Sequence, residues 1–279
     1  MTYIAVLLTS HNRKHLTCLG IDALYKTKQI QGYSIEVFLV DDGSTDGTSE
    51  SIKDQFPEVN IIQGNGNLFW NQGMRLSWNT AVQKREFDFF LWLNDDTILD
   101  PSALLQFIKT YTEAVLLEKR EVIITAACRS DFNNDVFSYG GRNDEGPIIP
   151  NGTLQECKYI NGNAVLVPKA VYKIVGNLSE DYTHGFGDVD YGLTALRNGF
   201  KCFTTRDYIA TCKPHTEIQG WCNPSLPLFK RWSLFHSPKG LNISEYKLFR
   251  KKFWPNQWIL DVIKAYIKMI LPLLYRKLL

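Results

Sequence analysis

Apolar runs that end in clusters of polar residues alternate with helix-like segments through the first half of this sequence. The expected strands are residues 4–9, 36–40, 59–62, 87–93 and 122–128. The expected helices between them are residues 13–26, 45–56, 73–85 and 100–118. Continuous apolar runs are typical of strands buried on both faces of a parallel sheet. The alternation therefore predicts an α/β fold with a mostly parallel, Rossmann-like sheet, helices on both faces, and ligands bound beyond the carboxyl ends of the strands.

The pattern changes in the second half. Residues 129–227 are rich in Gly, Asn and Pro, with expected strands at 136–139, 158–167 and 208–211 and an expected helix at 188–198. Residues 228–279 carry eleven Lys and Arg against two acidic residues, a net charge of +9, which leaves −7 for the rest of the chain. No internal repeat or low-complexity linker separates these parts. The simplest partition is one domain over 1–227 and a basic helical appendage over 228–279.

The overall composition, 44% apolar and 22% charged residues in a chain of 279, is that of an ordinary folded protein. Met1 to Ile4 lead directly into an apolar run without the basic segment and cleavage site of a secretory signal, so we expect a cytoplasmic protein. The six cysteines form no C-x-x-C pair, which argues against a zinc ribbon or a redox dithiol and favours reduced, mostly buried thiols.

Two adjacent carboxylates, Asp95 and Asp96, follow the most apolar of the expected strands. Their mutual repulsion at the end of a buried strand calls for a cation. Mg²⁺ and Mn²⁺ prefer hard oxygen ligands, and Mg²⁺ is typically held by one or two carboxylates together with substrate phosphates. The alternative is a helix cap or an exposed turn, which is the commoner role of an isolated Asp pair. The choice between the two depends on which other groups meet the pair.

Two further strand ends supply such groups. The segment 40–48, VDDGSTDGT, places acids and glycines after the expected strand 36–40. Carboxylates can accept hydrogen bonds from a base or a ribose, and glycines let a ligand approach the backbone. The first strand ends in the polar segment 9–13, TSHNR. Because the carboxyl ends of parallel strands share one edge of the sheet, we expect these clusters to converge.

Taken in order, these motifs resemble those of the family-2 glycosyltransferases, including bacterial rhamnosyltransferase-like members, which have the GT-A fold. The resemblance extends from about residue 4 to residue 214 and rests on LTSHNR (8–13), VDDGSTDGT (40–48), NGNLFWNQGM (65–74) and LNDDT (93–97). It implies a nucleotide-sugar half over 1–128 and an acceptor half over 129–227.

The same resemblance implies roles for individual residues. Thr9 and Asp42 would contact the nucleotide base, Asp95 the ribose or the metal, and Asp96 the metal, Mg²⁺ or Mn²⁺. The other implied contacts to the nucleotide sugar are Asn12, Arg13, Asp41, Asn67, Trp70, Gly73, Arg75 and Asn94. For Arg75, a solvated helix arginine is the alternative.

A later motif, GFGDVDYG at 185–192, matches the family motif that carries the catalytic base. An inverting transfer needs one carboxylate to take the proton of the acceptor hydroxyl, and the match implies that Asp188 does so, with a helix N-cap as the alternative.

Many enzymes of this fold use a late His as a further metal ligand, and His215 is the candidate, with a plain surface residue as the alternative. The sequence departs from the family at Asn94 and Gly187, where many relatives carry acids. The metal assignment therefore rests on Asp96, and Asp95 is shared between metal and ribose.

These motifs predict a metal-dependent, inverting hexosyltransferase. It would move a sugar from a nucleoside-diphosphate sugar to a hydroxyl of a glycan or lipid-linked glycan, as in the synthesis of a cell-envelope polysaccharide. A nucleotidyltransferase would need a basic, Gly-rich phosphate loop near the N-terminus, and a dinucleotide oxidoreductase would need G-x-G-x-x-G after the first strand; neither pattern is present. A non-catalytic sugar-nucleotide-binding protein is the alternative from another class, and it would be expected to have lost the metal or base carboxylates.

Residues 258–271, WILDVIKAYIKMIL, predict an amphipathic helix whose polar positions 261, 264 and 268 share one face. Its basic flanks fit a helix that lies in an anionic membrane interface, so we expect residues 246–279 to hold the protein peripherally on the inner face of the cell membrane. The alternatives are packing on the catalytic domain or on a second subunit of a homodimer. The Trp and Leu content argues against nucleic acid as the partner.

Overall fold

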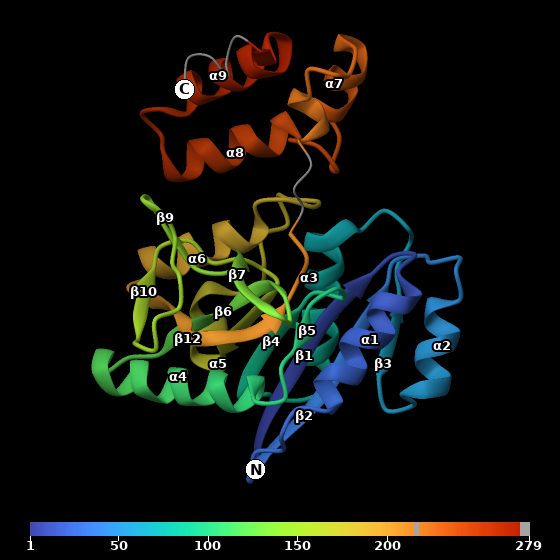
Figure 1. Cartoon of the computed structure of the whole chain (residues 1–279), viewed down its shortest axis with the longest axis vertical. Coiled ribbons are helices and arrows are strands. Elements are labelled where there is room, and N and C mark those ends of the chain that lie inside the picture. Colours follow the sequence, from blue (N-terminus) through green and yellow to red (C-terminus); the bar gives the residue numbers. More distant parts are fainter. Residues whose placement is uncertain (215–217, 274–279) are drawn as a thin grey trace.

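The computed structural model describes residues 1–214 and 218–273 and has the expected mixed α/β architecture (Figure 1). The strands are β1 (Thr2–Ser10), β2 (Tyr33–Asp41), β3 (Asn60–Gln63), β4 (Phe89–Leu93), β5 (Ile98–Leu99), β6 (Val122–Asp131), β7 (Asn134–Tyr139), β8 (Arg142–Asn143), β9 (Gly146–Pro147), β10 (Gln155–Cys157), β11 (Ala164–Pro168) and β12 (Lys201–Thr211). The helices are α1 (Lys14–Tyr25), α2 (Thr48–Gln55), α3 (Phe69–Lys84), α4 (Ala103–Glu118), α5 (Lys169–Val175), α6 (Gly187–Arg197), the short 3-10 helix η1 (Gly220–Cys222), α7 (Leu228–Phe235), α8 (Ile243–Phe253) and α9 (Trp258–Ile270).

The main sheet has the strand order β10-β12-β6-β11-β4-β1-β2-β3, with β5 on β12 and β7 on β6. Strands β3, β2, β1 and β4 are parallel to one another, and β12 is parallel to β6. Strand β11 is antiparallel to both β4 and β6. The sheet is therefore mostly parallel, as expected, and the carboxyl ends of β1, β2 and β4 lie at one edge.

Alternate residues of the central strands face two separate apolar layers. Ile4, Val6 and Leu8 of β1 pack in a cluster with residues of α1, α2 and α4. Ala5 and Leu7 face the other side, in a cluster with residues of α3, α5 and α6. Both faces of the strand are buried, which explains why its sequence is apolar throughout instead of alternating with polar residues. Helices on both faces hold the strand ends in fixed positions.

Several expected elements have different bounds in the structure. The expected strand 208–211 is the end of the longer strand β12, which begins at Lys201. Helix α3 begins at Phe69, four residues before the expected start. The expected strand 158–167 is shorter, because the backbone at Tyr159 pairs with Arg142 and the strand β11 begins only at Ala164. Helix α4 begins at Ala103 rather than at residue 100, because the carboxylate of Asp100 pairs with the guanidinium of Arg129 at 2.8 and 2.9 Å instead of capping the helix.

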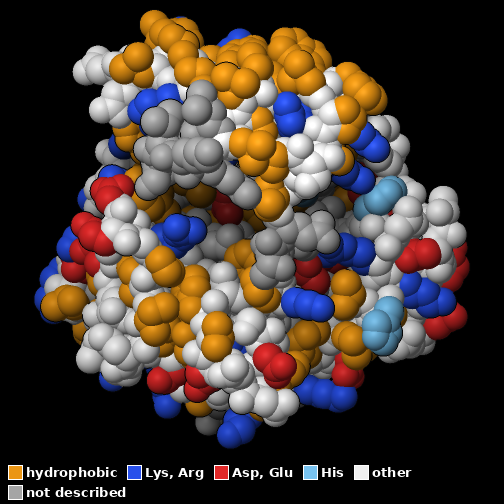
Figure 2. Space-filling view, turned by 45° about the horizontal axis from the view of Figure 1, so that its top comes forward, with side chains coloured by type: hydrophobic (Ala, Val, Ile, Leu, Met, Phe, Trp, Pro, Cys, Tyr) orange, Lys and Arg blue, Asp and Glu red, His pale blue; other side chains and the backbone are white. Residues whose placement is uncertain are grey.

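The C-terminal helices α7, α8 and α9 form a helical unit that lies over the carboxyl ends of the parallel strands (Figure 1). Its core contains Trp221, Phe235 and Met269, so residues before the expected boundary at 227/228 pack with it. Helix α8 also packs on the α/β part through Phe249. Figure 2 shows hydrophobic side chains gathered over this end of the molecule. Within the described residues, none of the helices combines the length and the apolar character needed to cross a membrane.

Candidate active site

A cleft of about 750 Å³ opens at the carboxyl ends of β1, β2 and β4. Most of the residues that the sequence predicted for the site lie in its walls. These are Thr9, Arg13, Asp42, Asn67, Trp70, Asn94, Asp95, Asp96 and Asp188. The parallel strands bring these distant segments together, because each chain segment leaves the sheet at the same edge.

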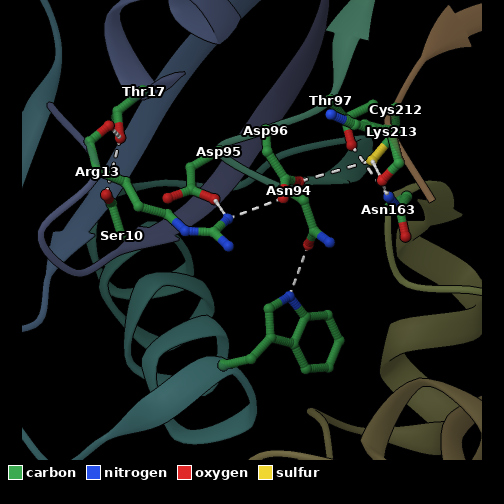
Figure 3. A network of polar contacts seen from close by, with 11 residues as sticks. Ser10, Arg13, Thr17, Asn94, Asp95, Asp96, Thr97, Asn163, Cys212 and Lys213 are labelled. Atoms are coloured by element: carbon green, nitrogen blue, oxygen red, sulfur yellow. Dashed lines mark hydrogen bonds and ion pairs between the residues drawn. The ribbon is translucent and has the colours of Figure 1, made fainter. Parts of the chain in front are cut away.

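The guanidinium of Arg13 lies between the carboxylates of Asp95 and Asp96 (Figure 3). A single nitrogen, Nη1, donates to Asp95 Oδ1 at 3.0 Å and to Asp96 Oδ2 at 2.8 Å. Burial raises the pKa of Asp95 to about 6; Arg13 opposes this shift and the neighbouring Asp96 adds to it. One oxygen from each of two adjacent acids therefore pairs with the same guanidinium nitrogen, whose positive charge offsets the repulsion between the carboxylates.

The carboxylate oxygens of Asp95 and Asp96 fit a divalent cation that binds together with a diphosphate. Among the residues that the structure describes, no group of three or more His, Cys, Asp and Glu side chains is arranged to hold a metal alone. Mg²⁺ needs only one or two carboxylates where substrate phosphates and water complete its octahedron. Asp95 and Asp96 supply such a pair at the cleft wall. The further predicted ligand, His215, lies outside the described residues.

Trp70 connects the two sides of the cleft. Its indole Nε1 donates to Asn94 Oδ1 at 2.7 Å, beside the Asp pair. The far edge of the ring packs against Gly162, where an added Cβ would lie only 2.5 Å from Cζ2 of the indole. The amide of Gly162 in turn donates to Asp188 Oδ2 at 2.8 Å. A continuous series of contacts thus joins the candidate base to the candidate metal ligands.

Asp188 lies in the first turn of α6 and faces the cleft. Its two carboxylate oxygens accept hydrogen bonds from the amides of Gly162 and Val189, each at 2.8 Å. Burial raises the pKa of Asp188, and these backbone amides oppose the shift. The carboxylate is therefore held in place while its basicity is increased, which suits a group that takes a proton from a hydroxyl.

The segment that leads into α6 is held by the helical unit. Glu245 of α8 accepts hydrogen bonds from the amide of Thr183 at 3.0 Å and from its hydroxyl at 2.7 Å. Phe186 has a φ of 68° and stacks on Phe249 of α8, with ring centroids 5.1 Å apart. A bulky side chain in this backbone region is strained, so the surrounding packing must maintain it. Helix α8 therefore helps to position the start of α6, where Asp188 lies.

Asp42, the predicted base contact, also shapes the opposite wall. Its Oδ1 accepts from the amide of Gly66 at 2.8 Å. Its Oδ2 accepts from the amides of Leu68 and Phe69 at 2.9 and 3.0 Å. One carboxylate thus holds the loop before α3 against the end of β2 and still borders the cleft.

Two predicted contacts, Asn12 and Asp41, lie outside the lining of this cleft. The amide of Thr45 donates to Asn12 Oδ1 at 2.7 Å. Asp41 is 2% exposed and accepts from the amide of Ser44 at 2.9 Å and from the hydroxyl of Ser49. Both side chains accept hydrogen bonds from the segment that follows β2, so they hold the loop that begins at Asp42.

Gly73 and Arg75 also lie outside the lining. At Gly73 an added Cβ would lie 2.2 Å from Thr9 Oγ1, so the missing side chain lets α3 approach β1. Arg75 points away from the cleft, donates to the carbonyl of Leu178 and lies 3.5 Å from the carboxylate of Glu180. Its side chain is 20% exposed, so it is not a freely solvated helix arginine either.

Several lining residues were not predicted. Asn161, Gly162 and Asn163 form one wall, and their Asn-Gly-Asn sequence is a turn signal that the expected strand 158–167 concealed. His184 borders Phe69 and Trp70, and Lys239 reaches the cleft from the connection between α7 and α8. No local pattern marks Lys239, because only the folding of the helical unit over the sheet brings it there.

Comparisons with known proteins agree with this arrangement. Residues 5–155 match the family model described as glycosyl transferase family 2. No curated protein sequence matches the chain.

Solved structures share the fold. One is a mannosyltransferase from Pyrobaculum calidifontis in complex with GDP-Man and Mn²⁺, 15% identical, with a TM-score of 0.59 over 96% of this chain and 70% of that one. Another is S. aureus TarS 1-349 in complex with UDP-GlcNAc, 13% identical, with a TM-score of 0.58 over 97% of this chain and 79% of that one. At these identities the likeness concerns the fold alone, and it confirms the expected GT-A type.

Proposed function

Because the chain belongs to glycosyl transferase family 2, we propose that it is a metal-dependent, inverting hexosyltransferase that uses a nucleoside-diphosphate sugar. The observation that carries this proposal is the meeting of Asp95, Asp96 and Asp188 in the walls of one cleft. The complexes of the two similar structures, with GDP-Man and Mn²⁺ and with UDP-GlcNAc, support this class of donor.

The donor would lie along the carboxyl edge of the sheet. Thr9 and Asp42 border the part of the cleft assigned to the nucleoside, and Asp95 and Asp96 the part assigned to the diphosphate. Trp70 offers an aromatic face between these residues and Asp188, where a sugar ring can pack.

Asp95 and Asp96 would hold Mg²⁺ or Mn²⁺. When bound, the cation would act as a Lewis acid on the leaving diphosphate. Arg13, which pairs with both carboxylates, would also be within reach of the phosphate oxygens, for which a guanidinium is well suited.

Asp188 would accept the proton of the acceptor hydroxyl as the oxygen forms its bond to the anomeric carbon. The bond between that carbon and the diphosphate breaks, and its electron pair leaves with the diphosphate. The hydrogen bonds from Gly162 and Val189 hold the carboxylate in position during this step. Attack opposite to the leaving group inverts the configuration of the sugar.

The acceptor would be a hydroxyl of a glycan or of a lipid-linked glycan at the inner face of the cell membrane. In support of this, the helical unit lies beside the cleft and contributes Lys239 to its wall.

A screen of nucleoside-diphosphate sugars by calorimetry, with MnCl₂ and with EDTA, tests the proposal. We expect one donor to bind in MnCl₂ and to lose affinity in EDTA, and an acceptor screen with that donor to yield free nucleoside diphosphate and the transferred sugar. Donor binding without turnover on any acceptor would favour the non-catalytic alternative. Release of pyrophosphate from a nucleoside triphosphate and a sugar phosphate would favour a nucleotidyltransferase.

A further inference from the structure

Helix α9 is apolar on its inward and on its outward side, because Ala265 and Met269 lie in the core of the helical unit while other apolar residues of the helix are exposed. Asp261 faces α8, where it accepts a hydrogen bond from Arg250 Nε at 2.8 Å, and Lys268 lies over the ring of Trp221, 5.2 Å from its centroid. In contrast, Ile259 and Leu260 are 56% and 59% exposed. A surface helix of a globular protein normally buries its apolar stripe. Here the apolar residues extend beyond the buried stripe, so the outward side of α9 is apolar as well.

Helix α7 extends this surface. Trp232 is 50% exposed, and its ring lies 6.2 Å from that of Tyr266 on α9, so the exposed sides of the two helices are adjacent. We define the outer apolar face as Leu228, Phe229, Trp232, Ile259, Leu260, Ile263, Ile267, Ile270, Leu271 and Leu273, all at least 41% exposed. Figure 2 shows the hydrophobic side chains gathered at this end of the molecule. An exposed apolar surface of this kind marks an interaction site.

The charges around the outer apolar face are of one sign. The acidic residues of segment 228–279 are Glu245 and Asp261, and both are used inside the protein, by Thr183 and by Arg250. Lys230 and Lys264 are exposed, and each directly follows an exposed apolar residue of the face, Phe229 or Ile263. The partner should therefore be apolar and should carry negative charge.

We propose that the outer apolar face inserts into the interface of a membrane that contains anionic lipid. Apolar side chains would enter the region between headgroups and acyl chains, and the lysines would meet the headgroups. A symmetric pair of copies through this face would bring like charges together without carboxylates to offset them. The inference rests on the proposed function only for the location of the acceptor, so lipid binding and donor binding can be tested separately.

Flotation of the full chain with vesicles of phosphatidylcholine, with and without phosphatidylglycerol, is the test. We expect the wild type to float with the anionic vesicles. The double variant Ile263→Asn/Ile267→Asn should bind them at least about tenfold more weakly, because two exposed isoleucines that would enter the membrane interface are replaced by polar side chains. The matched control is Leu116→Asn/Leu117→Asn, which changes two exposed leucines of α4, 64% and 65% exposed, outside the outer apolar face. This control should float like the wild type.

Lys264→Glu tests the charge, and it should weaken binding to the anionic vesicles in proportion to their phosphatidylglycerol content. Thermal unfolding followed by circular dichroism should give a Tm close to that of the wild type for every variant, which shows that each has folded. Equal flotation of the wild type and the isoleucine variant would overturn the proposal, and so would the absence of flotation. Light scattering that shows a wild-type dimer and a monomeric isoleucine variant, neither of which floats, would assign the face to a second copy of the chain instead.

Discussion

Lys252 on α8 donates to both carboxylate oxygens of Asp190 on α6, at 2.8 Å each. The hydroxyl of Tyr182 donates to the same carboxylate, also at 2.8 Å. The Asp190 side chain is 4% exposed. Because Asp190 lies two residues after Asp188, one turn of α6 carries both the carboxylate that binds helix α8 and the candidate base.

Lys252→Met would leave the buried carboxylate of Asp190 without its counter-charge. We expect the free energy of unfolding to fall by about 2 kcal/mol, less than the loss for a fully buried pair because Lys252 is itself 37% exposed. Urea denaturation followed by circular dichroism measures the change. Lys251→Met, at the exposed neighbouring position of α8, is the control and should change stability by less than about 0.5 kcal/mol. Equal losses in the two variants would show that the ion pair contributes nothing.

Arg13→Met tests whether the guanidinium serves as the counter-charge of Asp95 and Asp96. Without it the two carboxylates repel, so we expect the Tm in EDTA to fall by roughly 3–6 °C, as about 1–2 kcal/mol would produce. MnCl₂ should then raise the Tm by more in the variant than in the wild type, because the cation no longer competes with an arginine. The control is Arg206→Met, which removes a surface pair with Glu113. An identical response to MnCl₂ in wild type and Arg13→Met would contradict the prediction.

Asp96→Asn should remove metal-dependent donor binding. The amide keeps the shape of the side chain but is a neutral and weaker ligand, so we expect the affinity for the nucleoside diphosphate in MnCl₂ to fall at least about tenfold. Calorimetric titration measures this loss, and Asp144→Asn, at a surface acid that pairs with Lys158, provides the control. The metal assignment fails if the Asp96 variant binds as tightly as the wild type.

Asp188→Asn should lower kcat by about 10²–10⁴-fold while donor affinity stays unchanged, because an amide cannot accept the proton. The pKa of Asp188 is raised by burial, so the wild-type rate should fall on the acid side at a pH above the usual 3.8 of an aspartate. The direction of this pH dependence follows from the role of Asp188. A general base is active only when it is ionised, so kcat falls as the pH drops through its pKa. A pH profile of kcat for wild type and variant checks this, and wild-type turnover in the variant would exclude Asp188 as the base.

The ionisation of Asp188 should also cost stability. Its pKa is higher in the folded chain than in the unfolded one, so its contribution to stability is present at low pH and is lost as the pH rises through the folded value. Asp188→Asn should therefore flatten this part of the stability profile, as measured by thermal unfolding across acid pH.

The sequence by itself determined the α/β class, the alternation of strands and helices with polar motifs at the strand ends, and most of the residues that line the cleft. Apolar runs such as 4–9 and 87–93 are typical of strands buried on both faces, and parallel strands place their ends at one edge. Thr9, Asp42 and Asp96 could be assigned to one site for that reason, and Asp188 was added through the resemblance of its motif to that of the family. These predictions depend on local patterns and on one topological rule.

Only the tertiary structure decided which partner each polar side chain takes. Asp100 could have capped α4 but pairs with Arg129, and Arg75 could have faced the cleft but binds the carbonyl of Leu178. Arg13, predicted as a nucleotide contact, lies between Asp95 and Asp96. The pattern of 258–271 showed an amphipathic helix but not which side faces inward. The burial of Ala265 and Met269 and the contact of Asp261 with Arg250 decided that, because the rotation of a helix depends on the surfaces it packs against.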